Sequence, residues 1–515
     1  MEGVGVFLKE NERPIPGRNR RKPWPPGRYR PRSMPRFRIR SSWRFGALWL
    51  FSAFFMAYSR PSGREGIVAA AMLARPEIAV SPPAPPPPAV GEPLAPFDHL
   101  MLVDARPGHP MCFFLECIVE GDLEEERLRK AVDEAARRHP RFCSRVAWRG
   151  GRPHWLLPDV QPAFVWHPQA EAMDPWRPVD LERESGVRIV ARPIGPRLHS
   201  VGMVVHHSVC DGIAACEFMG DLWACYEGLE PRGFSRPATR GNEGPKPTPG
   251  EQSPAIDPVG EAIAFARFFP AALARTRSAA TEPRSDAIEP PYATIELDEA
   301  FTSRLRAAAA ARKATVNDLI VAAVMRAAVA WNDRAGKRRG GVRVTMPVST
   351  RAPRQREPAS NEISYAFLDR SREACRDRES LVGSLAAASR WILASGAVVG
   401  FLEAVRFLSK SPLFLKAVTR LPICLSTVIV SNLGDVSRRM RAGVPKIDGR
   451  DAPGGLVIRG FRGVPPLRPR TRASVAVLPY AGTTTLSCLC SASPNPQAAG
   501  LEFLEVIRRE LEGFQ

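Results

Sequence analysis

Two adjacent histidines, followed at a short spacing by aspartate and glycine, are the residues of this sequence best suited to chemistry. His206 and His207 open the run HHSVCDG, which Asp211 and Gly212 close. An imidazole titrates near neutral pH, so it can take a proton from a hydroxyl or amine that attacks a carbonyl. Because the chain has only eight histidines, this pattern should arise by chance about once in a few thousand such sequences. The motif predicts a general base, and we expect His207 to be that base.

We expect supporting roles for the residues around His207. His206 would pack or hydrogen-bond beneath the site. Asp211 lies where a helix is predicted to start, so its carboxylate could cap that helix or pair with an arginine. Arg351 is the candidate partner, because the run PVSTR that it closes also ends a predicted strand. Gly212 would let the start of the helix approach the opposite part of the molecule closely.

A second polar pair follows a strongly apolar stretch. The residues from Leu425 to Val430 predict a strand, and Ser431 and Asn432 come directly after it. Attack on a carbonyl of the kind considered for His207 would place negative charge on the carbonyl oxygen, which needs hydrogen-bond donors aimed at it in advance. The Ser431 hydroxyl and the Asn432 amide could supply them. Ser-Asn-x-Gly is also ordinary turn chemistry, so a purely structural role for the pair stays open.

The hydrophobic pattern predicts the elements that must position these groups. In the first half it indicates a strand, a hairpin and a helix, at Met111–Glu120, Val187–Arg192 with Leu198–Val205, and Asp211–Tyr226. Asp122 and Glu125 have the spacing of a capping box, which predicts that another helix starts directly after Asp122. The second half repeats this alternation of strands and helices.

Two successive bodies of this kind predict an α/β fold of layered lobes. We place the N-terminal lobe, which carries the histidine motif, at residues 93–230 and the C-terminal lobe at 291–515. Residues 231–290, rich in Pro, Gly and charge at their start, would be a linker with a connecting helix. Residues 1–92 would be a disordered basic and Pro-rich tail.

The charge of the chain is concentrated in that tail. Of the formal net charge of +20, residues 1–64 hold 15 Lys or Arg against three Glu. The bases of the body are scattered rather than striped, which argues against nucleic acid as a partner. The apolar segment 46–58 is shorter than the roughly 20 residues of a membrane span. An interfacial anchor, an atypical signal and a non-structural extension remain open for it.

The ten cysteines show neither zinc-ligand spacing nor a disulfide framework. Several lie in apolar runs, which indicates small hydrophobic side chains kept reduced in a cytosol. We therefore expect no bound metal and a cytoplasmic protein, with membrane association left open. The stretch from Val399 to Leu421 bears on that question, because its apolar residues are interspersed with basic ones. It could bind a lipid surface or simply pack on a lobe, and Pro412 should divide it in two.

The motif HHSVCDG resembles the HHxxxDG signature of the superfamily that contains chloramphenicol acetyltransferase, nonribosomal-peptide condensation domains, alcohol acetyltransferases and bacterial wax ester synthase/diacylglycerol acyltransferases. Further stretches resemble this superfamily in order and spacing. They are Pro93–Asp98, Ala131–Pro140, Pro347–Arg351 with Asn361, and Ser431–Gly434. The resemblance covers residues 93 to 513. It is nearest to the alcohol acetyltransferase and wax ester synthase branches, because SNLGD stands roughly where condensation domains carry a DFGWG-type motif.

The resemblance implies two similar lobes with a tunnel between them and His207 midway along it. It implies an O-acyltransferase that uses the thioester of acyl-CoA, or of the phosphopantetheine arm of an acyl carrier protein, and that holds no bound cofactor. The acceptor would be an alcohol. A stand-alone condensation enzyme that forms an amide with an amine acceptor, and an inactive scaffold of the same fold, are the alternatives.

Overall fold

The computed structural model describes the chain from residue 90 onward, apart from one long segment and several short ones. The described residues are 90–156, 160–166, 176–235, 291–334, 336, 340–352, 355–395, 398–421, 424–490 and 496–515. The apolar segment 46–58 and most of the expected linker lie outside them.

The first sheet has five strands and carries the histidine motif at the end of one of them. Its order is β14-β2-β7-β6-β5, in which β5 runs parallel to β6 and the other neighbours are antiparallel. The strands are β14 (Val457–Val464), β2 (Cys112–Glu120), β7 (Leu198–His206), β6 (Val187–Gly195) and β5 (Ala163–Trp166). The predicted hairpin of β6 and β7 is confirmed. Apolar clusters lie on both faces of this sheet, which is why nearly all of β2 is buried.

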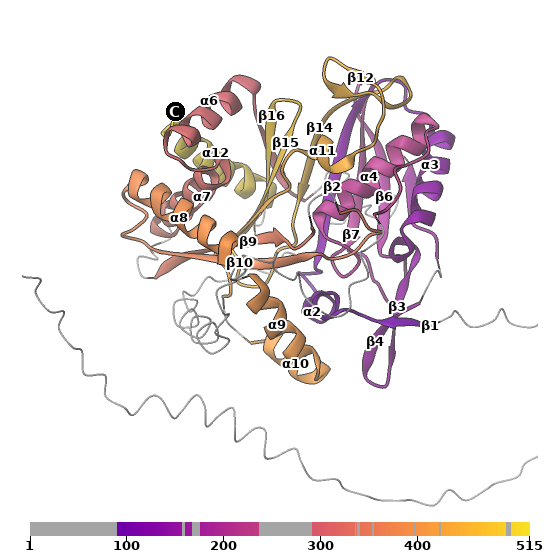
Figure 1. Ribbon diagram of the computed structural model, residues 1–515, viewed down its shortest axis with the longest axis horizontal. Helices are drawn as coiled ribbons and strands as arrows, with labels where there is room; N and C mark the ends of the chain where they lie inside the picture. The colour runs from indigo at the N-terminus through magenta and orange to yellow at the C-terminus, as the bar shows by residue number, and fades with distance from the viewer. Residues whose placement is uncertain are drawn as a thin grey trace, which may run out of the picture. The chain divides into compact units, whose positions relative to one another are not determined.

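Helices α3 (Glu125–Arg138) and α4 (Gly212–Glu227) cover one face of the first sheet (Figure 1). Phe218 and Leu222 of α4 share a core with the apolar side chains of β7. The helix ends at Gly228, whose φ of 86° lies in the left-handed region that favours glycine at a helix C-terminus. The predicted helix over this segment is therefore confirmed.

The start that we expected for α3 is wrong. The helix begins at Glu125, its N-cap residue is Glu124 in an extended conformation, and no side chain caps it. Asp122 instead forms an exposed ion pair with Arg197, at 3.2 Å. The physical reason lies in Leu123, which packs against the core and keeps the chain extended before the first helical turn.

The second sheet has six strands in the order β10-β9-β11-β15-β16-β8. Strand β11 runs parallel to β9 and β15, and the remaining pairs are antiparallel. The strands are β10 (Ile363–Ser371), β9 (Gly341–Ser349), β11 (Val428–Asn432), β15 (Ala473–Tyr480), β16 (Thr483–Cys490) and β8 (Ala293–Leu297). Its main helices are α6 (Glu299–Ala311), α7 (Val316–Arg334), α8 (Arg378–Ser395) and α12 (Pro496–Glu512), which share one apolar core with the sheet. The protein is thus an α/β layered fold of two lobes.

The two lobes are interleaved rather than consecutive. Strand β14 comes from the second half of the chain but pairs with β2 of the first sheet. The short helix α11 (Val436–Met440) likewise packs on α4. Contact between these helices is so close that a Cβ on Gly220 would lie 2.0 Å from the main-chain oxygen of Met440. Only glycine fits there.

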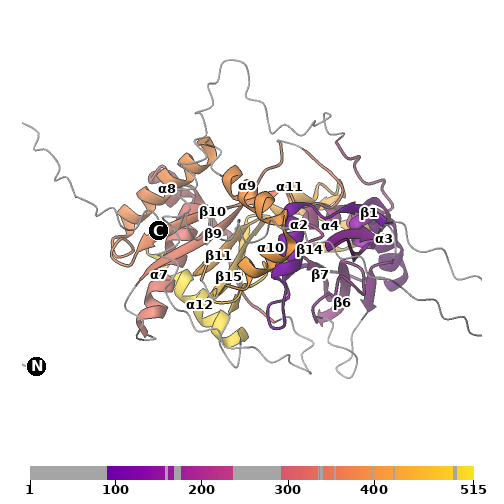
Figure 2. The ribbon, with the colours of Figure 1, turned by 90° about the horizontal axis from the view of Figure 1, so that it is seen from below.

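Three helices connect the lobes on the lower side of the molecule. Helices α2 (Pro96–Asp104), α9 (Val398–Ser409) and α10 (Pro412–Thr419) pack against one another, and Figure 2 shows them together from below. The expected break at Pro412 is confirmed, because α10 starts there. Among the described residues no single helix has the length and apolar composition of a membrane span. Two pairs of successive helices, α6 with α7 and α8 with α9, reach that length and composition only when the two helices of a pair are taken together. The chain bends between the two helices by 98° in the first pair and by 61° in the second.

The remaining elements are small. Strands β1 (Val90–Pro93), β3 (Arg145–Arg149) and β4 (Arg152–Leu156) form a three-stranded sheet beside the first lobe. The pair of β12 (Lys446–Ile447) and β13 (Arg450–Asp451) precedes β14, and the short 3₁₀ turns are Pro140–Cys143 and Pro453–Gly455.

Candidate active site

His207 follows directly on the last residue of β7 and faces a cavity between the lobes. Its main-chain N–H donates to the carbonyl of Met111 at 2.9 Å, which fixes the chain beside the neighbouring strand. The imidazole is 7% exposed and meets the rings of Phe113 and Phe97 edge-on, with centroids 5.3 and 6.0 Å away. The structure therefore holds this side chain in one apolar position at the cavity wall.

Burial lowers the pKa of the His207 imidazole below its ordinary value. Its own main-chain carbonyl, the charge of Asp211 and the side chain of Asn361 act in the opposite direction but do not offset burial. The ring nitrogen Nδ1 has no hydrogen-bond partner among the described residues. At neutral pH the ring is therefore uncharged, which is the form that can accept a proton.

His206 lies beneath the site instead of in the cavity. It is 3% exposed, and its Nδ1 accepts a hydrogen bond from the main-chain N–H of Ser208 at 3.2 Å. Burial, and secondarily the neighbouring His207, lowers its pKa to about 3. His206 is thus a neutral side chain that shapes the turn after β7.

Asp211 is the main anchor of this turn. One carboxylate oxygen accepts from the main-chain N–H groups of Ile213 and Ala214, both at 3.0 Å, and so caps α4. The other accepts from Nη1 of Arg351 at 2.7 Å and from the main-chain N–H of Glu362 at 2.8 Å. The side chains of Asp211 and Arg351 are 1% and 7% exposed. The expected pair is therefore present and ties the histidine turn to the segment after β9.

Gly212 touches the opposite lobe. A Cβ at this position would lie 2.8 Å from Cδ2 of Leu433, which comes directly after β11. The missing side chain is what allows the start of α4 to approach that loop. Leu433 and Gly212 both line the cavity.

Ser431 and Asn432 reach the same cavity from the end of β11. Both ends of the Asn432 carboxamide already have hydrogen-bond partners. Its nitrogen donates to Oδ1 of Asn317 at 3.1 Å. Its oxygen accepts from the main-chain N–H of Gly434 at 2.9 Å. The bond from Gly434 is the turn chemistry considered above, whereas the bond to Asn317 joins the end of β11 to α7. The Ser431 hydroxyl remains a candidate donor toward the cavity.

The cavity has a volume of about 300 Å³ and mostly apolar walls from both lobes. Its apolar lining includes Met101, Phe113, Ile363, Tyr365, Phe401, Val405, Leu408 and Val464. Thr345 of β9 adds a buried hydroxyl without a hydrogen-bond partner among the described residues. Two guanidinium groups, those of Arg439 and Arg468, also line it. An apolar chamber with a few polar groups is typical of a small-molecule site.

Asn361 and Asp98 support the histidine turn in a way that the sequence did not indicate. The Asn361 amide nitrogen lies 2.7 Å from the main-chain oxygen of His207, 3.3 Å from that of Ser208 and 2.9 Å from Oδ1 of Asp98. The other carboxylate oxygen of Asp98 accepts a hydrogen bond from Nη1 of Arg141 at 3.2 Å. The main-chain oxygen of Asp98 accepts one from the Ser208 hydroxyl. Burial raises the pKa of Asp98 to about 6, against the opposing effects of Arg141 and Asn361. Both residues belong to stretches that carried the resemblance, which was the only signal for them.

Similarity to known proteins is found at the level of structure. No family model and no curated protein matches the sequence. Polyketide synthase associated protein 5 from Mycobacterium tuberculosis is 18% identical, with a TM-score of 0.54 over 82% of this chain and 98% of that chain. The first condensation domain of the CDA synthetase is 16% identical, with a TM-score of 0.55 over 83% and 96%.

A third solved structure is that of a variant of the starter condensation domain of rhizomide synthetase RzmA, in complex with C8-CoA and Leu-SNAC. It is 13% identical, with a TM-score of 0.51 over 82% of this chain and 94% of that chain. These likenesses run through nearly the whole length of the three proteins, with both lobes present. The chain therefore has the two-lobed fold of the condensation domains.

Proposed function

We propose that this protein is an acyltransferase that moves an acyl group from a CoA or carrier-protein thioester to a hydroxyl acceptor, with His207 as the general base. The observation that carries the proposal is one buried imidazole at the wall of an apolar chamber between two lobes, where burial lowers its pKa. Such a chamber excludes water from a thioester, and the imidazole activates the attacking group.

The chemistry would proceed in two stages. His207 takes the proton of the acceptor hydroxyl while that oxygen forms a bond to the thioester carbonyl carbon. The tetrahedral intermediate then collapses, the carbon–sulfur bond breaks, and the imidazolium returns its proton to the thiolate. The products are an ester and a free thiol. Asp211 and Arg351 do not enter these steps, because their hydrogen bonds keep them in the loop and the adjoining segment.

The negative oxygen of the intermediate requires a donor in the chamber. The hydroxyls of Ser431 and Thr345 are the candidates, because both line the chamber and Thr345 Oγ1 has no partner among the described residues. Asn432 is a weaker candidate, since its amide group already bonds to Asn317 and Gly434.

The lining of the chamber favours an alcohol over an amine. Asp211 is the one carboxylate among the described lining residues, and both of its oxygens already accept two hydrogen bonds each. A protonated amine would find no free negative charge there to hold it. This supports the alcohol acetyltransferase and wax ester synthase reading. Amide formation remains the second candidate, because the neighbours named above include condensation domains.

For the donor we propose acyl-CoA or an acyl group carried on a phosphopantetheine arm that is supplied by a separate protein, in the cytoplasm. The RzmA neighbour was solved with C8-CoA, so that domain accommodates an acyl-CoA. The apolar lining of the present chamber suits an acyl chain.

Product analysis tests the proposal. The purified chain would be incubated with acyl-CoA of several chain lengths and with matched acceptors that differ only in carrying a hydroxyl or an amine. Mass spectrometry should find the ester, together with one free thiol per ester formed. An amide as the main product would favour the second candidate, and acyl-CoA hydrolysis alone would contradict acyl transfer.

A further inference from the structure

Helices α9 and α10 have one face in the chamber and another face in solvent. We call this helix pair, from Val398 to Leu421, the arm. It packs on α2 and β10 and projects from the lower side of the body (Figure 1). Its inner face lines the chamber through Phe401, Ala404, Val405, Leu408, Leu415, Val418 and Thr419. The arm is therefore a wall between the proposed substrate site and the outside.

The outer face of the arm carries large apolar side chains that are exposed to solvent. Leu413 is 80% exposed, Phe407 53% and Leu421 48%. Single exposed apolar residues are ordinary on protein surfaces. Here three of them occur in a stretch of fifteen residues of the arm. No other element among the described residues packs over this face.

Basic side chains accompany these apolar ones. Arg406, Lys410, Lys416 and Arg420 are all exposed, whereas Glu403 is the one acid of the arm and already pairs with Arg406 at 2.7 Å. A short helix with apolar and basic residues on its outer face is suited to the boundary of an anionic membrane. Self-association through this face would instead bring the positive charges of two arms together.

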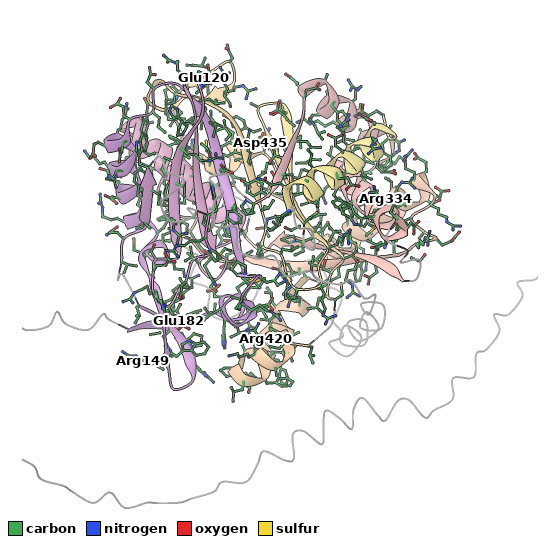
Figure 3. The ribbon with its side chains drawn as sticks, turned by 180° about the vertical axis from the view of Figure 1, so that it is seen from behind. Glu120, Arg149, Glu182, Arg334, Arg420 and Asp435 are labelled. Atoms are coloured by element: carbon green, nitrogen blue, oxygen red, sulfur yellow. The ribbon has the colours of Figure 1, made fainter. Side chains whose placement is uncertain are left out.

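A second element with the same character projects on this side. In the hairpin of β3 and β4, three side chains lie next to the turn. They are Trp148, which is 44% exposed, and Arg149 and Arg152. Figure 3 shows Arg149 of this hairpin and Arg420 of the arm on the same side of the body. Tryptophan and arginine are favoured at the interface of a bilayer.

We propose that the arm docks on an anionic lipid surface, so that an apolar substrate passes from the bilayer along the inner face of the arm into the chamber. The passage of substrate rests on the proposed function, whereas the docking does not. The surface chemistry is that of a negatively charged phospholipid headgroup layer. Leu413 and Phe407 would enter the acyl boundary, and Lys410 and Lys416 would contact the headgroups.

Flotation of the full chain with phospholipid vesicles tests the docking. Wild type should bind vesicles that contain phosphatidylglycerol more strongly than vesicles of phosphatidylcholine alone. The double variant Phe407→Ser/Leu413→Ser should weaken binding to the anionic vesicles about tenfold or more, given the apolar area withdrawn. Lys410→Gln/Lys416→Gln should weaken it about fivefold per charge, with little change on phosphatidylcholine.

The matched control is Ile447→Ser/Leu501→Ser. These residues are 48% and 46% exposed but lie on β12 and α12, away from the arm. The basic residues 1–64 are present in all the proteins, so the difference between variants reports on the arm alone. Equal binding of the arm variant and wild type would overturn the proposal, as would an equal loss in the control.

Two further results separate this proposal from its alternatives. A concentration-dependent dimer in analytical ultracentrifugation, dissolved by Phe407→Ser/Leu413→Ser, would assign the surface to a second copy and overturn lipid docking. The arm variant should also keep its rate on a water-soluble short-chain substrate. Vesicle binding needs no turnover, so absence of acyl transfer in every protein would remove the proposed function while the docking stands on its own test.

Discussion

Replacing Asp211 by asparagine should lower both the free energy of unfolding and the rate of the reaction. The asparagine oxygen can still accept from Ile213 and Ala214, but the adjoining amide group would then face the donors of Arg351 and Glu362. If the carboxamide rotates by half a turn, its nitrogen faces Ile213 and Ala214 and the cap of α4 is lost instead. Either way the guanidinium of Arg351, whose side chain is 7% exposed, loses the charged carboxylate that it pairs with. Removing one partner of a buried pair costs about 3–5 kcal/mol, a large share of the about 5–15 kcal/mol of a typical domain.

Asp298→Asn is the matched control for this change. Asp298 caps α6 by accepting from the main-chain N–H of Phe301 at 2.6 Å, and no arginine pairs with it among the contacts described. Asparagine caps helices about as well as aspartate, so this variant should stay within about 0.5 kcal/mol of wild type. Calorimetric unfolding and the steady-state rate of both variants would be compared. An Asp211→Asn protein with the melting temperature and rate of wild type would refute the structural role of Asp211.

Three shorter predictions concern the chamber. Because the pKa of His207 is lowered, the acidic limb of a kcat/KM–pH profile should lie below about pH 6.5, since the base stays uncharged until the pH falls through that pKa; a limb above pH 7 would contradict this. Ser431→Ala should lower kcat by about 10²- to 10³-fold if its hydroxyl binds the oxyanion, whereas Asn432→Ala should mainly lower stability. A large loss of kcat in Asn432→Ala with none in Ser431→Ala would exclude Ser431 as the oxyanion donor. Gly212→Ala should lower the free energy of unfolding by only about 1 kcal/mol, the low end for an overpacked site, because the atom at 2.8 Å is Cδ2 at the end of the flexible Leu433 side chain. Leu433→Ala should restore part of this loss, and no restoration would show that the contact is not the cause.

Much of the fold follows from local patterns. The hairpin before the histidine motif, the helix from Asp211 to Gly228 and the break at Pro412 are all recognisable from spacing and capping residues. Strand β14 was not predicted. Its sequence contains two glycines and two arginines, and it becomes a strand through pairing with β2, more than 330 residues earlier along the chain. Local periodicity holds no information about such a partner.

The candidate site could likewise be predicted from the sequence only in part. The pairing of Asp211 with Arg351 could be predicted, because each residue stands at the end of a patterned element and their charges are opposite. The clamp of Asn361 and Asp98 on the histidine turn could not be derived from either residue alone. It depends on α2, the turn after β7 and the segment before β10 meeting in space. Thr345 was missed for a similar reason, since a threonine within an apolar strand gives no sign of facing a cavity.

The rate of the His207→Ala protein tests the central claim most directly. The assay would follow thiol release from acyl-CoA together with ester formation, in parallel with His154→Ala, whose imidazole lies on β4 and hydrogen-bonds to the Arg152 carbonyl. We predict a fall in kcat of about 10²- to 10⁴-fold for His207→Ala, with the wild-type melting temperature retained and the His154 variant unchanged. A folded His207→Ala protein that keeps most of its acyl-transfer rate would contradict the assignment of His207 as the base.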